Sequence, residues 1–287
     1  MAHEWCRLLC GRFTSISEVF SLITVHTLAS GSSGNASLIR CGDTALLLDT
    51  GISCRRITTS LRELGLTADD LTAVLITHTH TDHIAGLATM LKRSDFPIFA
   101  SNAAARDLLY RMPACAGRLE SFPAGETLSL GSFTVRPFAI SHDAPGACGY
   151  RLDTEEGSVG LLTDSGYVTE AAAETLPGCD LVLLEANHDV ETLECGPYPY
   201  FLKERILGNR GHLSNETAAR FAVSLVRSGT RELILSHLSR ENNTPAMAYN
   251  AVERALSAAG LAPRLTVAPR DCLSEPYTVS GRNVCRK

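Results

Sequence analysis

The stretch THTHTDHIAG at residues 77–86 constrains the fold of this chain more than any other segment. It places three histidines and one aspartate at the end of AVLIT, an apolar run that is too short for a helix and is typical of a buried strand. On an extended segment His78 and His80 point to the same side, because side chains alternate with a period of two. Asp82 and His83 follow at the turn into a helix, so they approach from a different side. The spacing therefore predicts two adjacent ligand sets for a pair of divalent cations.

The ligand types narrow the choice of metal. Imidazole and carboxylate together suit zinc, with manganese or iron as alternatives, because no thiolate is present in the cluster to enforce a soft site. A surface loop with fortuitous histidines is the other interpretation, and the density of the cluster and the strand before it disfavour it. We therefore expect two divalent metal ions as cofactors, with zinc as the first candidate and manganese as the second.

The rest of the chain alternates short β-type runs with helical patterns. Strands are expected in VHTLAS, ASLIRC, TALLLDTG, AVLIT, PIFAS, SFTVRPFAI, CGYRLD, SVGLLTDSG, DLVLLEAN, ELILSHLS and RLTVA. Helices are expected over residues 53–64, 84–91, 102–110, 215–228 and 245–258. No internal repeat or proline-rich linker divides the chain. The order of elements favours one α/β domain with sheet in the middle and helices outside.

We expect this domain to span residues 24–287. Residues 1–23 contain basic residues and apolar clusters, but no clean apolar core followed by a small-residue cleavage site. They are interpreted as a dispensable extension, with a weak signal peptide as the alternative.

The bulk composition limits location and partners. The formal net charge is −5, so the chain lacks the basic field of a protein that coats long nucleic acid, and a phosphate-bearing substrate must be held by a local site. Ten cysteines are scattered without a C-x-x-C pair, which favours reduced thiols and a cytoplasmic location. No run of about 18 apolar residues occurs, so we expect no membrane span. Nothing in the sequence specifies an obligate protein partner.

The histidine cluster resembles the hallmark of the metallo-β-lactamase superfamily, H-x-H-x-D-H after a hydrophobic strand. Further motifs of that superfamily match in order: Asp49 in LLLDTG, His142 in AISHDA, Asp164 in LLTDSG and His237 in LILSHLS. Singly these residues are weak signals, because a lone histidine or aspartate at a strand end is more often structural. Together, in register with the hallmark, they are strong. The resemblance implies an αββα sandwich with the metal site at the strand ends.

The resemblance also implies a role for each of these residues. One metal would be held by His78, His80 and His142. The other would be held by Asp82, His83 and His237. Asp164 and a water or hydroxide would bridge the two metals, and Asp49 would orient the metal loop from behind.

More specific segments are similar to the YycJ type of this superfamily, also called the WalJ type. They are SGSSGN, GISCRR, LEANHD, GNRGHLSN and SHLSRENN, and the similarity runs from His26 to about Ala251. It implies a bacterial cytoplasmic nuclease that acts on DNA. The second half also resembles ribonuclease Z, in which residues corresponding to Glu185 and His212 serve the leaving group. We therefore expect Asp82, Glu185 and His212 to take part in catalysis.

Some residues admit two interpretations. His212 and Asn215 are candidates for contact with substrate, but both can instead cap the following helix; we favour function for His212 and the cap for Asn215. The five motifs assign no metal role to His188. SGSSGN is either a phosphate cradle or a tight turn between two strands.

These patterns predict a phosphodiesterase, specifically a DNA exonuclease, in which a hydroxide bridging the two metals attacks phosphorus. Two alternatives stay open. One is a hydrolase of a small lactam, thioester or cyclic phosphodiester, which the absence of a basic net charge permits. The other is a non-catalytic, regulatory metal-binding protein in cell-wall signalling, which the complete ligand set disfavours.

Overall fold

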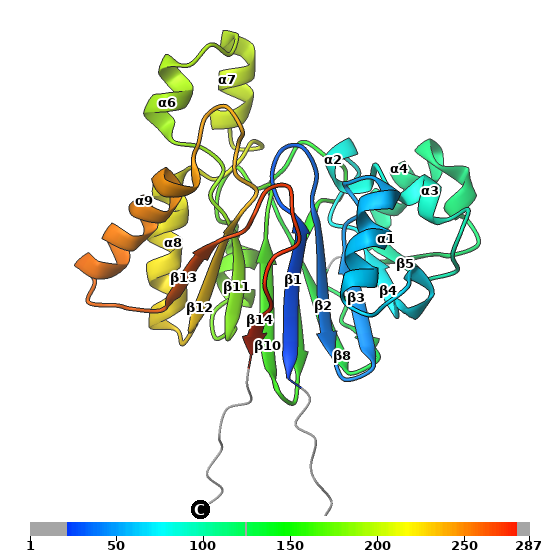
Figure 1. The fold of residues 1–287 in the computed structure, drawn as a ribbon. Helices are drawn as coiled ribbons and strands as arrows, with labels where there is room; N and C mark the ends of the chain where they lie inside the picture. Colours follow the sequence, from blue (N-terminus) through cyan, green and yellow to red (C-terminus); the bar gives the residue numbers. More distant parts are fainter. Residues whose placement is uncertain (1–21, 124, 280–287) are drawn as a thin grey trace, which may run out of the picture.

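The computed structural model describes residues 22–123 and 125–279, which form two seven-stranded sheets packed face to face (Figure 1). Helices cover the outer face of each sheet, so the fold is the expected αββα sandwich. Most of the expected extension, residues 1–21, lies outside the described part, and the first strand begins at Ile23. No helix in the described part is long and apolar enough to cross a membrane.

The first sheet draws mainly on the N-terminal half of the chain. Its strands are β1 (Ile23–Ala29), β2 (Ala36–Cys41), β3 (Thr44–Leu48), β4 (Ala73–Leu75), β5 (Ile98–Ser101), β6 (Leu119–Phe122) and β14 (Tyr277–Val279). In space they run β14-β1-β2-β3-β4-β5-β6, with parallel pairing from β3 to β6. Every residue of β3 and β4 is buried, as expected for parallel strands covered on both faces.

The second sheet comes from the C-terminal half. Its strands are β7 (Leu128–Leu130), β8 (Phe133–Ala139), β9 (Cys148–Thr154), β10 (Gly157–Leu162), β11 (Leu181–Glu185), β12 (Glu232–Ser236) and β13 (Arg264–Val267). They run in space β13-β12-β11-β10-β9-β8-β7, with parallel pairing from β10 to β13. Both β8 and β10 pair antiparallel with β9, so they share one direction.

Apolar side chains hold the layers together. The middle layer, between the sheets, includes the buried rings of Phe122, Phe133 and Tyr150. The outer layer on the first sheet is formed by α1 (Cys54–Glu63), α2 (Thr81–Ile84), α3 (Leu87–Met90) and α4 (Asn102–Arg111). On the second sheet it is formed by α5 (Glu170–Thr175), α8 (Asn215–Arg227) and α9 (Pro245–Ala258).

Two expectations for the helices need correction. The helix expected over residues 84–91 is two short helices, α2 and α3, because the chain turns at Gly86, whose N–H donates to the Thr50 carbonyl at 2.8 Å. The sequence patterns also missed α6 (Val190–Cys195) and α7 (Tyr200–Leu207), which stand as a hairpin beyond the strand ends of the second sheet (Figure 1).

The topology gathers several strand ends at one edge of the sandwich. Because β3 and β4 are parallel, and β8, β10, β11 and β12 also share a direction, each sheet presents a set of C-terminal strand ends. The loops after β4, β8, β10 and β12 carry the expected ligand residues, Asp49 follows β3, and Glu185 ends β11. This edge is therefore where the two halves of the chain can build one site.

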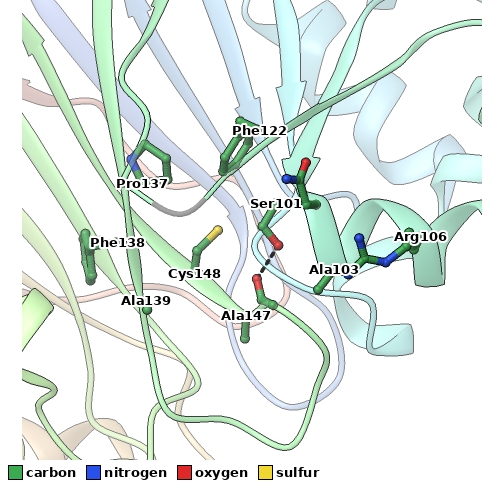
Figure 2. A pocket seen from close by; sticks show the side chains of 12 residues that line it. Ser101, Ala103, Arg106, Phe122, Pro137, Phe138, Ala139, Ala147 and Cys148 are labelled. Carbon is green, nitrogen blue, oxygen red and sulfur yellow. Dashed lines mark hydrogen bonds between the residues drawn. The ribbon is translucent and has the colours of Figure 1, made fainter.

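A cavity of about 210 Å³ lies beside this edge, between α4 and the β8–β9 strands (Figure 2). Its lining is mostly apolar and includes Phe122, Phe138 and Cys148, with Arg106 of α4 at one side. Burial raises the pKa of the Cys148 thiol to about 12, so this cysteine is a neutral, apolar wall residue. None of the expected metal ligands lines the cavity, which separates it from the histidine cluster.

Candidate metal centre

Three strand ends at this edge have an unusual backbone. Asp49, Asp164 and His237 are the non-glycine residues with positive φ in the described part of the chain, at 59°, 58° and 54°. They follow β3, β10 and β12 within two residues. A non-glycine residue in this conformation costs about 1–3 kcal/mol and persists only where the surrounding structure imposes it. The strain therefore lies where the ligands were expected.

The loop that follows β4 is held against the β1–β2 turn and the segment after β3. The N–H of Asn35 donates to the carbonyl of Asp82 at 2.8 Å, and the Asn35 amide nitrogen lies 3.1 Å from Nε2 of His83. A Cβ atom on Gly51 would lie 1.6 Å from the same Asp82 carbonyl oxygen. Only glycine allows this approach, so residue 51 fixes how closely the loop packs.

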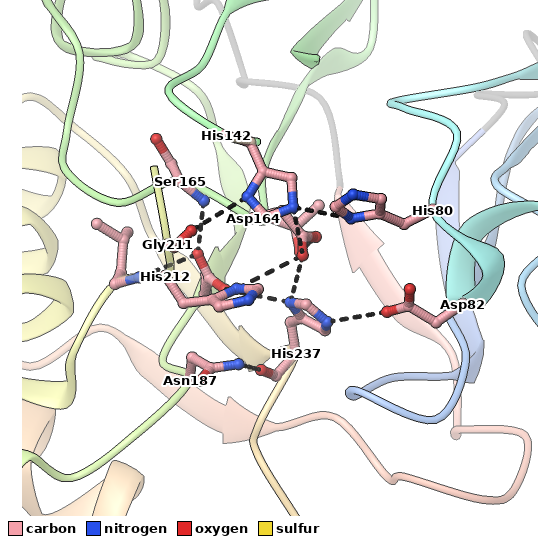
Figure 3. Close-up of polar contacts among 12 residues, drawn as sticks. His80, Asp82, His142, Asp164, Ser165, Asn187, Gly211, His212 and His237 are labelled. Atoms are coloured by element: carbon pink, nitrogen blue, oxygen red, sulfur yellow. Dashed lines mark hydrogen bonds and ion pairs between the residues drawn. The ribbon is translucent and has the colours of Figure 1, made fainter. Parts of the chain in front are cut away.

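The first donor group contains His78, His80 and His142, each with one ring nitrogen within 4.8 Å of the others. Nδ1 of His78 lies 3.1 Å from the Thr77 hydroxyl, and Nδ1 of His142 lies 3.2 Å from the Gly211 carbonyl. Nε2 of His142 lies 3.1 Å from Nδ1 of His80 (Figure 3). Nε2 of His78 is buried without a hydrogen-bond partner.

The second donor group contains Asp82, His83 and His237. Nδ1 of His83 lies 2.7 Å from Oδ2 of Asp49, which also accepts the Thr77 hydroxyl at 2.8 Å. This contact turns Nε2 of His83 toward Oδ2 of Asp82, 3.5 Å away. Nε2 of His237 is 3.5 Å from that same oxygen and is buried without a hydrogen-bond partner.

Asp164 lies between the two groups and is almost completely buried. Its Oδ2 lies 3.2 Å from Nε2 of His83, and its Oδ1 lies 3.2 Å from Nδ1 of His237 and 3.9 Å from Nε2 of His142. The structure thus brings all seven expected ligand residues together, with Asp164 at the position expected of a bridge.

The charge balance of the cluster fits divalent cations. Burial alone would lower the pKa of His237, but Asp164, Asp82 and Glu185 outweigh it and raise that pKa to about 10. Burial likewise opposes ionised His83, yet Asp164 and Asp49 hold its pKa well above the ordinary value. The buried carboxylates thus favour positive charge at this position, which divalent cations would supply when bound. This donor set, all imidazole and carboxylate, suits zinc or manganese.

Glu185 and His212 form a pair next to the donor groups. Nδ1 of His212 lies 2.8 Å from Oε1 of Glu185, and the His212 side chain is 20% exposed. Glu185 itself is fully buried and also accepts the backbone N–H groups of Ser165 at 2.9 Å and Leu213 at 3.2 Å. The same Oε1 lies 3.1 Å from Nδ1 of His237. The carboxylate thus fixes both His212 and His237, a member of the second donor group.

Asn215 does not reach the cluster. It is fully buried at the start of α8, where its side-chain amide exchanges hydrogen bonds with that of Asn243 at 3.1 and 2.9 Å. The N-cap of α8 is Ser214, whose hydroxyl accepts the Thr217 N–H at 3.2 Å, so the expectation that Asn215 is the cap is wrong. We infer that Asn215 ties α8 to the loop after β12, and its contact with substrate stays a prediction.

His188 is also set apart from the donor groups. It is 1% exposed, neither ring nitrogen has a hydrogen-bond partner, and burial lowers its pKa to about 4. Among the described residues it belongs to none of the potential metal-binding groups.

The patterns missed several residues that support the site. SGSSGN is the turn between β1 and β2, and besides Asn35 it supplies Ser30, whose hydroxyl accepts the His237 N–H at 2.8 Å. Its position after β1, a strand that ends at the same edge, was the available signal. Asp143, next to His142 in the sequence, lies beside His80 with 3.4 Å between Oδ1 and Nε2. No pattern in the sequence points to this contact.

With this geometry established, comparison with known proteins defines the class. Residues 44–238 match the family model described as the Beta-lactamase superfamily domain, and the chain belongs to that superfamily. It is a metal-dependent hydrolase with the metallo-β-lactamase fold.

Similar proteins give a narrower comparison. The chain is 37% identical over 237 residues to the exodeoxyribonuclease WalJ of Streptococcus pneumoniae, covering 82% of this chain and 88% of the relative. It is 33% identical over 236 residues to the exodeoxyribonuclease YycJ of Bacillus anthracis, covering 81% and 89%. The crystal structure of the metallo-β-lactamase fold protein YhfI from Bacillus subtilis aligns with a TM-score of 0.66 over 90% of this chain and 99% of that chain; at 20% identity it supports the fold alone.

Proposed function

We propose that this chain is a dinuclear metal-dependent phosphodiesterase that removes nucleotides from the ends of DNA. The observation that carries the proposal is the Glu185–His212 pair, 2.8 Å apart, beside two donor groups that meet at Asp164. The relatives named exodeoxyribonucleases, which are similar along most of this chain, support the choice of DNA.

Two divalent cations, when bound, would lower the pKa of a water molecule for attack and would neutralise charge on the phosphoryl oxygens. His78, His80 and His142 would hold one of them. Asp82, His83 and His237 would hold the other, and Asp164 would bind both. Asp49 keeps the Nε2 lone pair of His83 turned inward, because the Nδ1 of that ring contacts its carboxylate at 2.7 Å.

His212 is suited to serve the leaving group. Its Nδ1 faces the Glu185 carboxylate, so that nitrogen carries a proton and Nε2 is the ring atom available to a substrate. Buried Glu185 holds the His212 ring by Nδ1, so that Nε2 can face the departing oxygen of a nucleotide and transfer a proton to it. The His212 side chain is 20% exposed, so a substrate can reach it.

The surface around the site suits a single-stranded end. The α6–α7 hairpin stands beyond the strand ends (Figure 1). It carries two exposed aromatic residues, Tyr200 at 74% and Phe201 at 71%. Exposed aromatic rings can stack on bases, and each such contact contributes about 1–3 kcal/mol. Arg205 and Arg210 lie where the hairpin meets the site, since they contact Asp143 and the His142 carbonyl. Cations at this point can hold phosphates close to the donor groups without a basic net charge.

The proposal is tested with an end-labelled DNA strand and a small phosphodiester, each assayed with zinc or manganese. Asp82→Ala should lose both bound metal and turnover of DNA, because it removes a ligand of the second group. Asp43→Ala, an exposed aspartate between β2 and β3, is the control and should behave as the native chain. Unchanged DNA turnover in Asp82→Ala would end the proposal for this site. Activity of the native chain on the small diester alone would overturn the choice of DNA.

A further inference from the structure

Asp143 is a carboxylate at the metal centre that belongs to neither donor group. Its Oδ1 lies 3.4 Å from Nε2 of His80 and 3.6 Å from Nε2 of His142. That oxygen is buried and makes no hydrogen bond in the described structure, so its contact with His80 is an ion-pair contact. Its other oxygen, Oδ2, accepts from Nε of Arg205 in α7 at 2.6 Å.

The contacts of His142 indicate which ring nitrogen of His80 would face a bound metal. Nδ1 of His142 lies 3.2 Å from the Gly211 carbonyl, which can only accept, so that nitrogen carries the proton and Nε2 carries the lone pair. Nε2 of His142 in turn lies 3.1 Å from Nδ1 of His80. This contact is an ordinary hydrogen bond if Nδ1 of His80 carries the proton. If a cation is held among His78, His80 and His142, both nitrogens would instead direct lone pairs at it. His80 would then bind through Nδ1 and carry its proton on Nε2, the atom next to Asp143.

We propose that Asp143 is a positioning residue that orients His80 for metal binding, and that Arg205 holds Asp143 in place from α7. The part concerning His80 rests on the metal sites of the proposed function, but not on DNA as the substrate. The arrangement parallels the Asp49–His83 contact, in which a carboxylate behind one nitrogen directs the other toward the metal.

The proposal also connects the α6–α7 hairpin to the metal centre. Arg205 lies in α7, and its partner Asp143 lies next to one metal ligand and beside another. The Arg205 side chain is 54% exposed, so its ion pair with Asp143 is partly screened by solvent. Removal of the Arg205 side chain should therefore weaken metal binding less than removal of the Asp143 side chain.

The test measures zinc affinity by competition with a chromophoric chelator, and the visible absorption spectrum of the cobalt-substituted chain. Asp143→Ala should weaken one of the two zinc equivalents about 10- to 100-fold, the range typical of partners behind metal ligands, and should change the cobalt spectrum. Arg205→Ala should weaken it less than about fivefold. The double variant should have the same zinc affinity as Asp143→Ala, because Arg205 affects the metal only through Asp143.

Asp153→Ala is the matched control. Asp153 is also paired with arginines, Arg151 at 2.9 Å and Arg136 at 3.4 Å, and is similarly exposed, but it lies on β9 away from the cluster. It should leave both zinc affinity and the cobalt spectrum unchanged. Should Asp143→Ala not fold by circular dichroism, Asp143→Asn keeps the size of the side chain and should still weaken zinc binding.

Each result has a defined meaning. Native zinc affinity and an unchanged cobalt spectrum in a folded Asp143 variant would overturn the role of Asp143. If the fold-loss of zinc affinity in the double variant equals the product of the fold-losses in the two single variants, the two residues act independently. That result would overturn the link through Arg205. A native chain that binds zinc but does not cleave DNA would contradict the proposed substrate and leave this inference standing.

Discussion

At the scale of single residues, the site depends on what holds the second nitrogen of each histidine. His83 contacts Asp49, His237 contacts Glu185, and His142 contacts a backbone carbonyl. Each contact fixes a ring orientation and leaves the opposite nitrogen for a cation. These contacts thus preorganise histidines of the two donor groups.

His212 provides a prediction at this scale. If it protonates the leaving group, His212→Ala should keep its metal and lose about 10²- to 10⁴-fold in kcat on DNA. On a diester with a p-nitrophenolate leaving group, which needs no proton, the loss should shrink. The measurements are metal content and kcat on both substrates. Equal losses on both would assign His212 to folding or to binding instead.

The residues differ in how well the sequence could predict them. His78, His80, Asp82 and His83 fall within six positions, so their spacing alone predicts a metal site. His142, Asp164 and His237 are distant from that run and are recognisable only through the order of family motifs. Asp143 could not be predicted, because its meaning depends on Arg205, which is 62 positions away in the chain.

At the scale of elements, the expected strands and longer helices follow their apolar patterns, whereas the short strands β6, β7 and β14 and the short helices α5, α6 and α7 were not expected. The helix expected at residues 245–258 is α9 with the same bounds. The α6–α7 hairpin was missed because α6 and α7 have six and eight residues, which is too short for a clear helical period. Helices of this length are set by tertiary contacts, such as that between Arg205 and Asp143.

Gly51 gives the prediction at this scale, because it lets the segment after β3 touch the metal loop. Gly51→Ala places a Cβ 1.6 Å from the Asp82 carbonyl oxygen, so the loop must move. We expect a loss of about 1–3 kcal/mol in the free energy of unfolding, together with weaker zinc binding. Denaturant titration and the chelator competition measure the two effects.

The control for that variant is Gly117→Ala. An added Cβ at Gly117 meets no atom within 4 Å, so the free energy of unfolding should change by less than about 0.5 kcal/mol. Gly51→Ala is compared directly with this control. If it has the same free energy of unfolding and the same zinc affinity as Gly117→Ala, the loop does not depend on this close approach.

At the scale of the whole molecule, the site joins the two halves of the sandwich. His78, His80, Asp82 and His83 follow a strand of the first sheet, whereas His142, Asp164 and His237 follow strands of the second. The middle apolar layer sets the distance between these strand ends, so the packing of the core places the ligands. The αββα class was predictable from the resemblance, but the meeting of the two sets of strand ends depends on sheet pairing that no local pattern encodes.

The central claim is that seven side chains from both sheets hold two divalent cations. It is tested most directly by anomalous X-ray scattering from crystals of the zinc-loaded chain, recorded on both sides of the zinc absorption edge. The account predicts two peaks per chain, one among His78, His80 and His142 and one among Asp82, His83 and His237, with Asp164 in contact with both. The absence of zinc from this edge, or zinc bound only elsewhere on the chain, would contradict it.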